Sequence, residues 1–324
     1  MSPEDFAIGV DVGGTNMRVA RISPSGEPLK KRNIPGSRDP FAAVDLIKNL
    51  VRDMGGARAR AIGVGIPGRV DGWTGAIFSG GFLNLAGIDL KGELEAAFGR
   101  PTLVANDCGM ALVGESRRGA ARGLKNSVML TIGTGIGGAV MESGAIVNGR
   151  RCAGQLGHLV VNIGGHPCPC GQRGCVETES SGTALRRHLD EAGYGREIRF
   201  EHLLREAEAG DARAIGVMCA WGGPLRAAIN TLSAAFDPNV VVLGGGMGQA
   251  AIRSLDFLPE LKTWYDVDVR LAELGDDAGV IGCGLAALDL ISGSLRDKKR
   301  LVMVNGVPAS GKSGLSRALS RKTG

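Results

Sequence analysis

The 324-residue sequence contains no long apolar segment and no recognisable leader. No apolar run approaches the roughly 18 to 20 residues that a helix needs to span a bilayer. The first residues, Met-Ser-Pro-Glu-Asp, lack the basic region and apolar stretch of a secretory signal. These absences argue against a helical membrane protein and a secreted one, and they predict a cytoplasmic protein with no membrane partner.

The body of the chain also lacks basic charge. The net charge is +5, but residues 296–324 hold eight basic residues against one acid, a balance of +7, and subtracting it leaves residues 1–295 near −2. The body therefore has no electrostatic footprint for nucleic acid, and we expect no such partner. We interpret the basic tail as a solvated segment. Its basic residues are Arg296, Lys298, Lys299, Arg300, Lys312, Arg317, Arg321 and Lys322.

Glycine is abundant, with 53 residues, and it marks an internal repeat. The segment FAIGVDVGGTNMRVARIS at 6–23 is an apolar run, a glycine turn and a second apolar run, which predicts two strands joined by a tight turn. The segment VMLTIGTGIGGAVMESG at 128–144 repeats this pattern. The repeat predicts two similar lobes, for which the chain is long enough.

Strand-like and helical patterns alternate along the chain. Helical spacing of apolar residues appears at 41–53, 90–98, 110–117, 214–235 and 278–291, with strand-like segments at 61–68, 102–107 and 239–248 between them. This order predicts an α/β protein whose fold is complete near Ser292.

Three glycine turns each follow an apolar strand. They are Gly13-Gly14-Thr15, Gly133-Thr134-Gly135 and Gly244-Gly245-Gly246. Glycines let successive backbone N–H groups point into one concavity, and threonine adds a hydroxyl, which suits phosphate oxygens. A single such turn is more often structural, but three of them, two in a repeat, favour nucleotide binding.

Two aspartates end buried strands beside these turns. Asp11 is placed to hold Mg²⁺ against nucleotide phosphates, although it could instead cap the turn. Asp107 follows Asn106 and is placed to accept a proton from an attacking hydroxyl. The alternative for Asp107 is a helix N-cap, because a helical pattern follows it.

A cysteine cluster occupies the segment after the second hairpin. Cys168, Cys170 and Cys175 supply three thiolates, and His158 or His166 could supply a fourth ligand. Four such ligands form a closed tetrahedral zinc site with no open position, so we interpret it as structural. A disulfide is disfavoured by the cytoplasmic compartment.

The C-terminal segment NGVPASGKS, at 305–313, matches the phosphate-binding pattern G-x-x-x-x-G-K-[ST]. It is followed by eleven residues, without the further strands and acids that a P-loop enzyme needs. We interpret it as the truncated start of a P-loop kinase domain that binds no nucleotide here. The alternative function is a P-loop nucleotide kinase of which only the first motif is present.

Seven motifs occur in the order found in one protein family: DVGGTNMR, GIPGRVD, AND, TIGTGIGG, GQLGH, CPCGQRGCVE and VVVLGGGMG. With them, residues 6–292 resemble the ROK family of bacterial sugar kinases and repressors. The resemblance implies a duplicated actin-like (RNase H-like) ATPase fold of two lobes, with the active site in the cleft.

The resemblance also implies an activity, transfer of the γ-phosphoryl group of ATP to a hexose or N-acetylhexosamine. Its cofactors would be Mg-ATP and a structural zinc ion. Asp107 would be the catalytic base, and His158 would complete the zinc site. Other sugar-contacting positions would be Gly68, Asn84, Asn106, Gln155, His158 and Glu177.

The same resemblance suggests how the chain is divided. Residues 1–113, with about 281–293, would form a small lobe, and residues 114–280 a large lobe with the zinc loop and the helices of a homodimer. Residues 294–324 would be a basic linker and the P-loop segment. A sugar-responsive regulator lacking its DNA-binding domain is the second candidate, disfavoured because only ten residues precede Asp11.

One motif departs from the family pattern. Gln155 stands where most of these kinases have glutamate in Gly-Glu-x-Gly-His, and Ile88 stands where an aromatic residue is common. A glutamine amide donates and accepts hydrogen bonds, whereas a carboxylate only accepts them. The sequence therefore leaves the sugar open among glucose, N-acetylglucosamine and N-acetylmannosamine.

Overall fold

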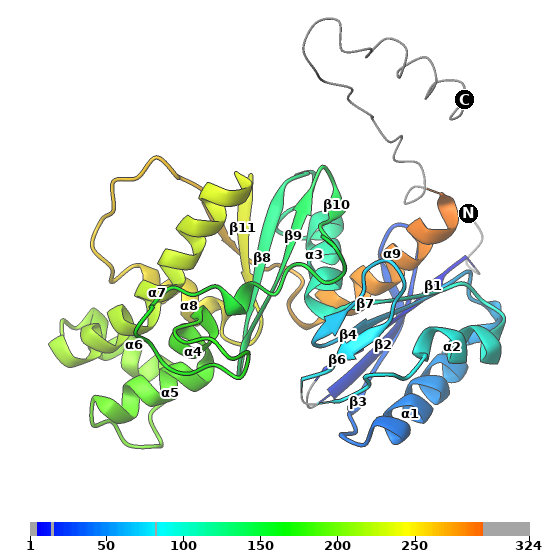
Figure 1. Ribbon diagram of the computed structural model, residues 1–324, viewed down its shortest axis with the longest axis horizontal. Helices are drawn as coiled ribbons and strands as arrows, with labels where there is room; N and C mark the ends of the chain where they lie inside the picture. The colour runs from blue at the N-terminus through cyan, green and yellow to red at the C-terminus, as the bar shows by residue number, and fades with distance from the viewer. Residues whose placement is uncertain (1–4, 14–15, 82, 294–324) are drawn as a thin grey trace, which may run out of the picture.

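The computed structural model describes residues 5–13, 16–81 and 83–293. Gly14, Thr15 and the predicted linker and P-loop segment at 294–324 lie outside the described residues. Figure 1 shows two lobes side by side, each built on one sheet. Within the described part, no helix is both long enough and apolar enough to cross a membrane.

The small lobe contains a mixed five-stranded sheet in the order β3-β2-β1-β4-β7. Strand β1 pairs antiparallel with β2 and parallel with β4, and β4 pairs parallel with β7. The strands are β1 (Ala7–Val12), β2 (Asn16–Ile22), β3 (Pro28–Pro35), β4 (Ile62–Ile66) and β7 (Thr102–Asn106). A separate hairpin consists of β5 (Arg69–Val70) and β6 (Ile77–Ser79).

The large lobe repeats this sheet. Its order is β10-β9-β8-β11-β12, with β8 antiparallel to β9 and parallel to β11. The strands are β8 (Ser127–Ile132), β9 (Ile136–Glu142), β10 (Ala145–Ile146), β11 (Val240–Gly244) and β12 (Asp268–Leu271). Because the order and the strand directions match those of the small lobe, the duplicated α/β fold predicted from the two glycine hairpins is confirmed.

Helices cover the outer face of each sheet (Figure 1). The small lobe carries α1 (Pro40–Asp53), the short η1 (Gly56–Arg58) and α2 (Leu90–Phe98). The large lobe carries η2 (Leu156–His158), α4 (Val176–Ser180), α5 (Gly182–Glu191), α6 (Phe200–Glu208), α7 (Ala212–Phe236) and α8 (Gly248–Leu255). The short η3 (Gly275–Asp277) leads into the last helix, and its aspartates pair with Arg18 and Lys31 of the small lobe.

The start of α1 illustrates why the predicted helices form. The Asp39 carboxylate accepts a hydrogen bond from the Ala42 backbone N–H, and Pro40 occupies the first turn, where its missing N–H costs nothing. Val44, Ile47 and Val51 are then buried at helical spacing. The helix predicted at 90–98 is α2, and the one predicted at 214–235 is α7 with short extensions.

Helices α3 (Asp107–Arg118) and α9 (Ala278–Ser292) lie between the two sheets, and their side chains form one core with residues of both. Helix α9 packs on the small-lobe sheet by backbone contact. A Cβ at Gly9 of β1 would overlap the carbonyl oxygen of Val280, and one at Gly63 of β4 would overlap that of Cys283. The two glycines are therefore required by this packing. The lobe boundaries at 113 and 281 fall inside these helices and stay a prediction.

We expect Gly63→Ala to lower the free energy of unfolding by about 3 kcal/mol or more, because the added methyl group must push α9 off the sheet. Gly216→Ala is the matched control, since nothing lies near that exposed position in α7 and alanine favours helix by about 1 kcal/mol. Urea unfolding of the three proteins measures both changes. Equal midpoints for Gly63→Ala and the parent chain would contradict the packing argument.

Candidate functional site

The two predicted carboxylates meet beside one glycine of β4. A Cβ at Gly65 would lie 3.4 Å from the Cα of Asp107 and 3.7 Å from Oδ1 of Asp11. Asp11 lies near the end of β1 and Asp107 begins α3, directly after β7. Since β1, β4 and β7 are adjacent and parallel, both residues reach the same edge of the sheet.

Asp11 is held in a setting that disfavours its ionised form. Burial and the nearby charge of Asp107 raise its pKa to about 7, although Arg18 acts in the opposite direction. Arg18, opposite Asp11 on β2, lies 3.6 Å from its carboxylate and 2.7 Å from Asp276. Gly279 of α9 leaves room for the Asp11 carboxyl group, because a Cβ there would lie 2.8 Å from its Cγ.

Asp107 is not the N-cap of α3, so the alternative interpretation of this residue is wrong. The cap is Asn106, whose Oδ1 accepts a hydrogen bond from the Gly109 N–H at 3.0 Å. Oδ1 of Asp107 accepts from the Cys108 N–H at 2.8 Å and from Nδ2 of Asn106 at 3.0 Å. Burial raises the pKa of Asp107, and these hydrogen bonds oppose that effect. The predicted helix thus begins three residues earlier, at Asp107.

Helices α4 and α5 hold the glycine turn after β8 by hydrogen bonds. The Gly133 carbonyl accepts from the Gly182 N–H at 2.8 Å, and the Thr134 carbonyl accepts from the Thr183 hydroxyl at 2.8 Å. Oε2 of Glu177 accepts from the Ile136 N–H at 2.9 Å. With their carbonyls occupied, Gly133, Thr134 and Gly135 form a fixed turn.

The other two glycine turns lie at the ends of strands in the same sheets. The turn of Gly244, Gly245 and Gly246 lies against the end of β8, because a Cβ at Gly245 would overlap the backbone of Ile132. Of the turn after β1, only Gly13 is described, and its N–H donates to the Asn16 carbonyl. The large-lobe turns are therefore neighbours.

Three predicted sugar-contacting residues, Gly68, Asn106 and Gln155, are joined by hydrogen bonds to one backbone carbonyl. The Gly68 oxygen accepts from Nδ2 of Asn106 at 3.0 Å and from Nε2 of Gln155 at 3.3 Å. Gly68 and Asn106 belong to the small-lobe side and Gln155 to the large lobe, so this cluster crosses the cleft. Glu177, another predicted sugar contact, instead accepts a hydrogen bond at the glycine turn after β8. Asn84 is exposed, and its side chain accepts a local hydrogen bond from the Ala86 N–H.

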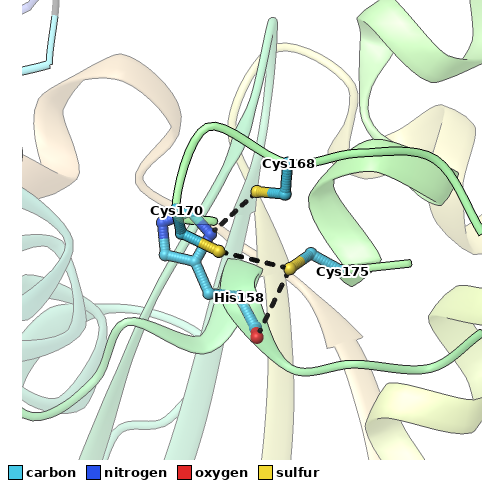
Figure 2. Close-up of side chains that lie close together, drawn as sticks. All are labelled: His158, Cys168, Cys170 and Cys175. Carbon is cyan, nitrogen blue, oxygen red and sulfur yellow. Dashed lines mark hydrogen bonds between the residues drawn. The ribbon is translucent and has the colours of Figure 1, made fainter. Parts of the chain in front are cut away.

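The predicted zinc ligands form a compact cluster. Figure 2 shows the side chains of His158, Cys168, Cys170 and Cys175 gathered together, and their ligand atoms lie within 4.8 Å of one another. Nδ1 of His158 is 3.5 Å from the Cys168 sulfur, and the Cys170 and Cys175 sulfurs are 3.6 Å apart. The sulfurs of Cys170 and Cys175 are too far apart for a disulfide. Ligands at 2.3 Å around a tetrahedral zinc ion would be about 3.8 Å apart, so the cluster fits that ion.

The second histidine does not join this cluster. His166 lies with its Nδ1 3.3 Å from Oε1 of Glu179, and its backbone N–H donates to the same oxygen. Its ring is thus committed to a buried carboxylate, and His158 is the imidazole of the metal cluster. The alternative His166 ligand is therefore wrong.

Sequence reasoning missed the residues that hold the carboxylates. Arg18 pairs with Asp11 across the hairpin, a register that the β1–β2 pairing makes available. Gly65, Gly279 and Cys283 surround the same carboxylates because α9 approaches the sheet so closely. The small-residue pattern AGVIGCG at 278–284 was the available signal, but the partner of that helix face could not be read from it.

Known proteins resemble this chain over most of its length. A sequence profile of the ROK family matches residues 7–289. A glucokinase from Halalkalibacterium halodurans is 32% identical over 307 residues, covering 86% of this chain and 93% of that protein. An N-acetylmannosamine kinase from Citrobacter koseri is 30% identical over 289 residues, covering 86% and 98%.

The fold agrees with a solved structure. The crystal structure of a ROK family glucokinase from Streptomyces griseus, in complex with glucose and AMPPNP, has a TM-score of 0.74 and 27% identity. The match covers 88% of this chain and 99% of that one. The likeness thus spans both lobes.

Proposed function

The chain belongs to the ROK family, and we propose that it is a sugar kinase that transfers the γ-phosphoryl group of ATP to a hydroxyl of a hexose or N-acetylhexosamine. The observation that carries this proposal is the pair of buried carboxylates, Asp11 and Asp107, beside Gly65 in a duplicated fold. Relatives at about 30% identity include a glucokinase and an N-acetylmannosamine kinase. These support the class of reaction and leave the sugar open.

Asp107 acts as the base in this proposal. Its Oδ1 is occupied by the hydrogen bonds from Cys108 and Asn106, so Oδ2 is the oxygen directed to the substrate hydroxyl. Fixing one oxygen sets the orientation of the other, which is what proton transfer in a positioned complex requires. Burial raises the pKa of Asp107, which makes it a stronger base than an exposed aspartate once ionised.

Asp11 would hold the magnesium ion of Mg-ATP. The donor set fits, because two neighbouring carboxylates whose charges raise each other's energy are stabilised by a divalent cation. When bound, the cation neutralises the charge that develops on the phosphoryl oxygens. The three glycine turns would cradle the phosphates with backbone N–H groups. AMPPNP, an analogue of ATP, accompanies the related glucokinase fold.

The sugar would lie between the lobes at the Gly68 carbonyl cluster. Asn106 and Gln155 meet there, and both carry an amide that can donate to or accept from hydroxyl groups. Asn84 would approach from its exposed loop. Glu177 is committed to the phosphate turn by one carboxylate oxygen and would meet the sugar with the other.

Zinc would hold the cysteine loop and His158 in place. Nδ1 of His158 faces the Cys168 sulfur, so its Nε2 is the ring atom that can reach a sugar hydroxyl. Burial, followed by the neighbouring thiols, raises the pKa of Cys175 to about 12, and a bound cation would be needed to make it a thiolate at neutral pH. Metal and sugar sites are thus joined through one imidazole.

We expect the protein to convert Mg-ATP to ADP when at least one of four sugars is added: glucose, mannose, N-acetylglucosamine or N-acetylmannosamine. Asp107→Asn should lower kcat by about 10²- to 10⁴-fold, because the base is lost while the shape is kept. Lys312→Ala, in the C-terminal P-loop pattern, should retain the parent rate. A zinc-replete folded protein that turns over no sugar would overturn the proposal, and loss of activity in Lys312→Ala alone would favour the P-loop alternative.

The acid side of the pH profile should reflect the two carboxylates. Asp107 must be ionised to accept a proton and Asp11 must be ionised to hold magnesium, so kcat/KM should fall as the pH drops through their pKa values. Burial raises the pKa of both above the ordinary value of about 4, and that of Asp11 to about 7. The profile of kcat/KM between pH 4.5 and 8 measures this limb. A rate that stays level down to pH 4.5 would contradict the assignment.

The zinc content of variants should show that His158 is a zinc ligand and that His166 is not. The parent chain and His166→Ala should each retain about one zinc ion per chain, whereas His158→Ala and Cys175→Ala should lose it on dialysis, since a structural site needs all four ligands. Elemental analysis measures the metal, and the thermal midpoint shows the lost stability. Retention of zinc by Cys175→Ala would rule out this site.

The homodimer, with its interface on the large-lobe helices, also stays a proposal. It rests on the family resemblance, and the mass of the full chain in solution tests it.

A further inference from the structure

A cavity of about 190 Å³ lies between the lobes, next to the proposed sugar site. Protein interiors rarely leave voids much larger than a water molecule, so a space of this size needs a reason. An apolar cavity of about 150 Å³ is large enough to bind benzene. Its apolar walls come from both sides of the cleft and include Val70, Leu103, Met110, Val113, Ala139 and Ile146.

The cavity has polar groups at more than one place. Asn106 and Gln155, which meet at the Gly68 carbonyl, line it beside the proposed sugar site. Asn148 lies against Gly72 of the small-lobe hairpin, and the ion pair of Arg117 and Asp289, 2.6 Å apart, lines another part of the wall. The Asn106 amide is also hydrogen-bonded to Asp107 at 3.0 Å. One hydrogen bond therefore separates the cavity wall from the proposed base.

The small-lobe hairpin closes the cavity on the outside. The Gly72 N–H donates to the Arg151 carbonyl at 2.8 Å, and the Trp73 indole donates to the Gly149 carbonyl at 3.4 Å. Gly72 and Trp73 line the cavity, as do Cys152 and Ala153. The outer end of the cavity is thus spanned by contacts between the two lobes.

Gln155 lies between the cavity and the Gly68 carbonyl, where a neutral amide is favoured over a carboxylate. An ionised glutamate against a largely apolar cavity would lose much of its hydration, whereas a neutral amide loses far less. Gln155 also donates to Gly68, which a carboxylate cannot do. A neutral Gln155, where the family pattern has glutamate, therefore suits a mostly apolar cavity wall.

From these observations we infer that the cavity receives an apolar acyl substituent of the sugar, so that the enzyme acts on N-acylhexosamines with room for acyl groups longer than acetyl. This inference rests on the proposed sugar kinase function. The Gln155 amide can accept from the N–H and donate to the C=O of an acylamino group, and the apolar walls beside it match the alkyl chain. A plain hexose would leave the space unfilled.

The test is an acyl series on one sugar ring. We expect kcat/KM for N-acetyl-, N-propionyl- and N-butyrylhexosamines of the gluco and manno series to rise by about fourfold per added methylene on the preferred ring. Ala139→Leu fills the cavity from β9 and should bring the ratio of butyryl to acetyl kcat/KM to about one or below. Because this ratio is taken within one preparation, a partly unfolded variant does not distort it.

Two further variants sharpen the result. Ala207→Leu adds the same bulk to the large-lobe core, away from the cavity, and should leave the butyryl-to-acetyl ratio at the parent value. Gln155→Glu places a carboxylate on the cavity wall and should lower the ratio of acylated to unacylated sugar.

The failures of the two proposals can be told apart. The acyl pocket is wrong if kcat/KM falls with acyl length in the parent chain, or if Ala139→Leu leaves the butyryl-to-acetyl ratio of kcat/KM unchanged. In either case, phosphorylation of a plain hexose would still support the kinase proposal. Absence of turnover on every sugar, acylated or not, overturns the kinase proposal itself.

Discussion

The close approach of α9 to its neighbours is the constraint on which the rest of this structure depends. Gly9 and Gly63 admit its backbone against the small-lobe sheet, and Gly114 of α3 admits it on the other side, because a Cβ at any of them would overlap a carbonyl oxygen. The sheet and α3 are thus fixed against one helix. Asp11, at the strand end, and Asp107, at the start of α3, are consequently held beside Gly65.

Two buried carboxylates held this way are an unfavourable arrangement by themselves. Desolvation and mutual repulsion raise the pKa of Asp11 to about 7, and burial raises that of Asp107. The fold therefore places beside Gly65 two carboxylates that a bound cation would stabilise, and in the proposed function the glycine turns would add backbone N–H groups to bind the phosphates of the same nucleotide. A magnesium-bound polyphosphate would satisfy both requirements, which supports the proposed phosphoryl transfer.

The cleft is closed by a few polar contacts over a mostly apolar seam. The Gly68 carbonyl joins Asn106 of the small-lobe side to Gln155 of the large lobe, and the hairpin at Gly72 joins the Arg151 carbonyl. Each of these hydrogen bonds adds only a modest free energy to the contact between the lobes, so hydrogen bonds to substrate hydroxyl or amide groups can replace them. In the proposed function, the cysteine loop would also bring His158 to the sugar.

The sequence alone determined the duplicated α/β fold, because two strand-turn-strand patterns and the periodicity of the helices are local signals, and it identified three cysteines and both aspartates. It could not choose between His158 and His166, decide whether Asp107 caps the helix that follows it, or show Arg18 against Asp11. Those outcomes depend on which segments meet in space. Only the tertiary structure brings Gln155 to Gly68 and opens a cavity behind them, since both arise from packing one lobe on the other.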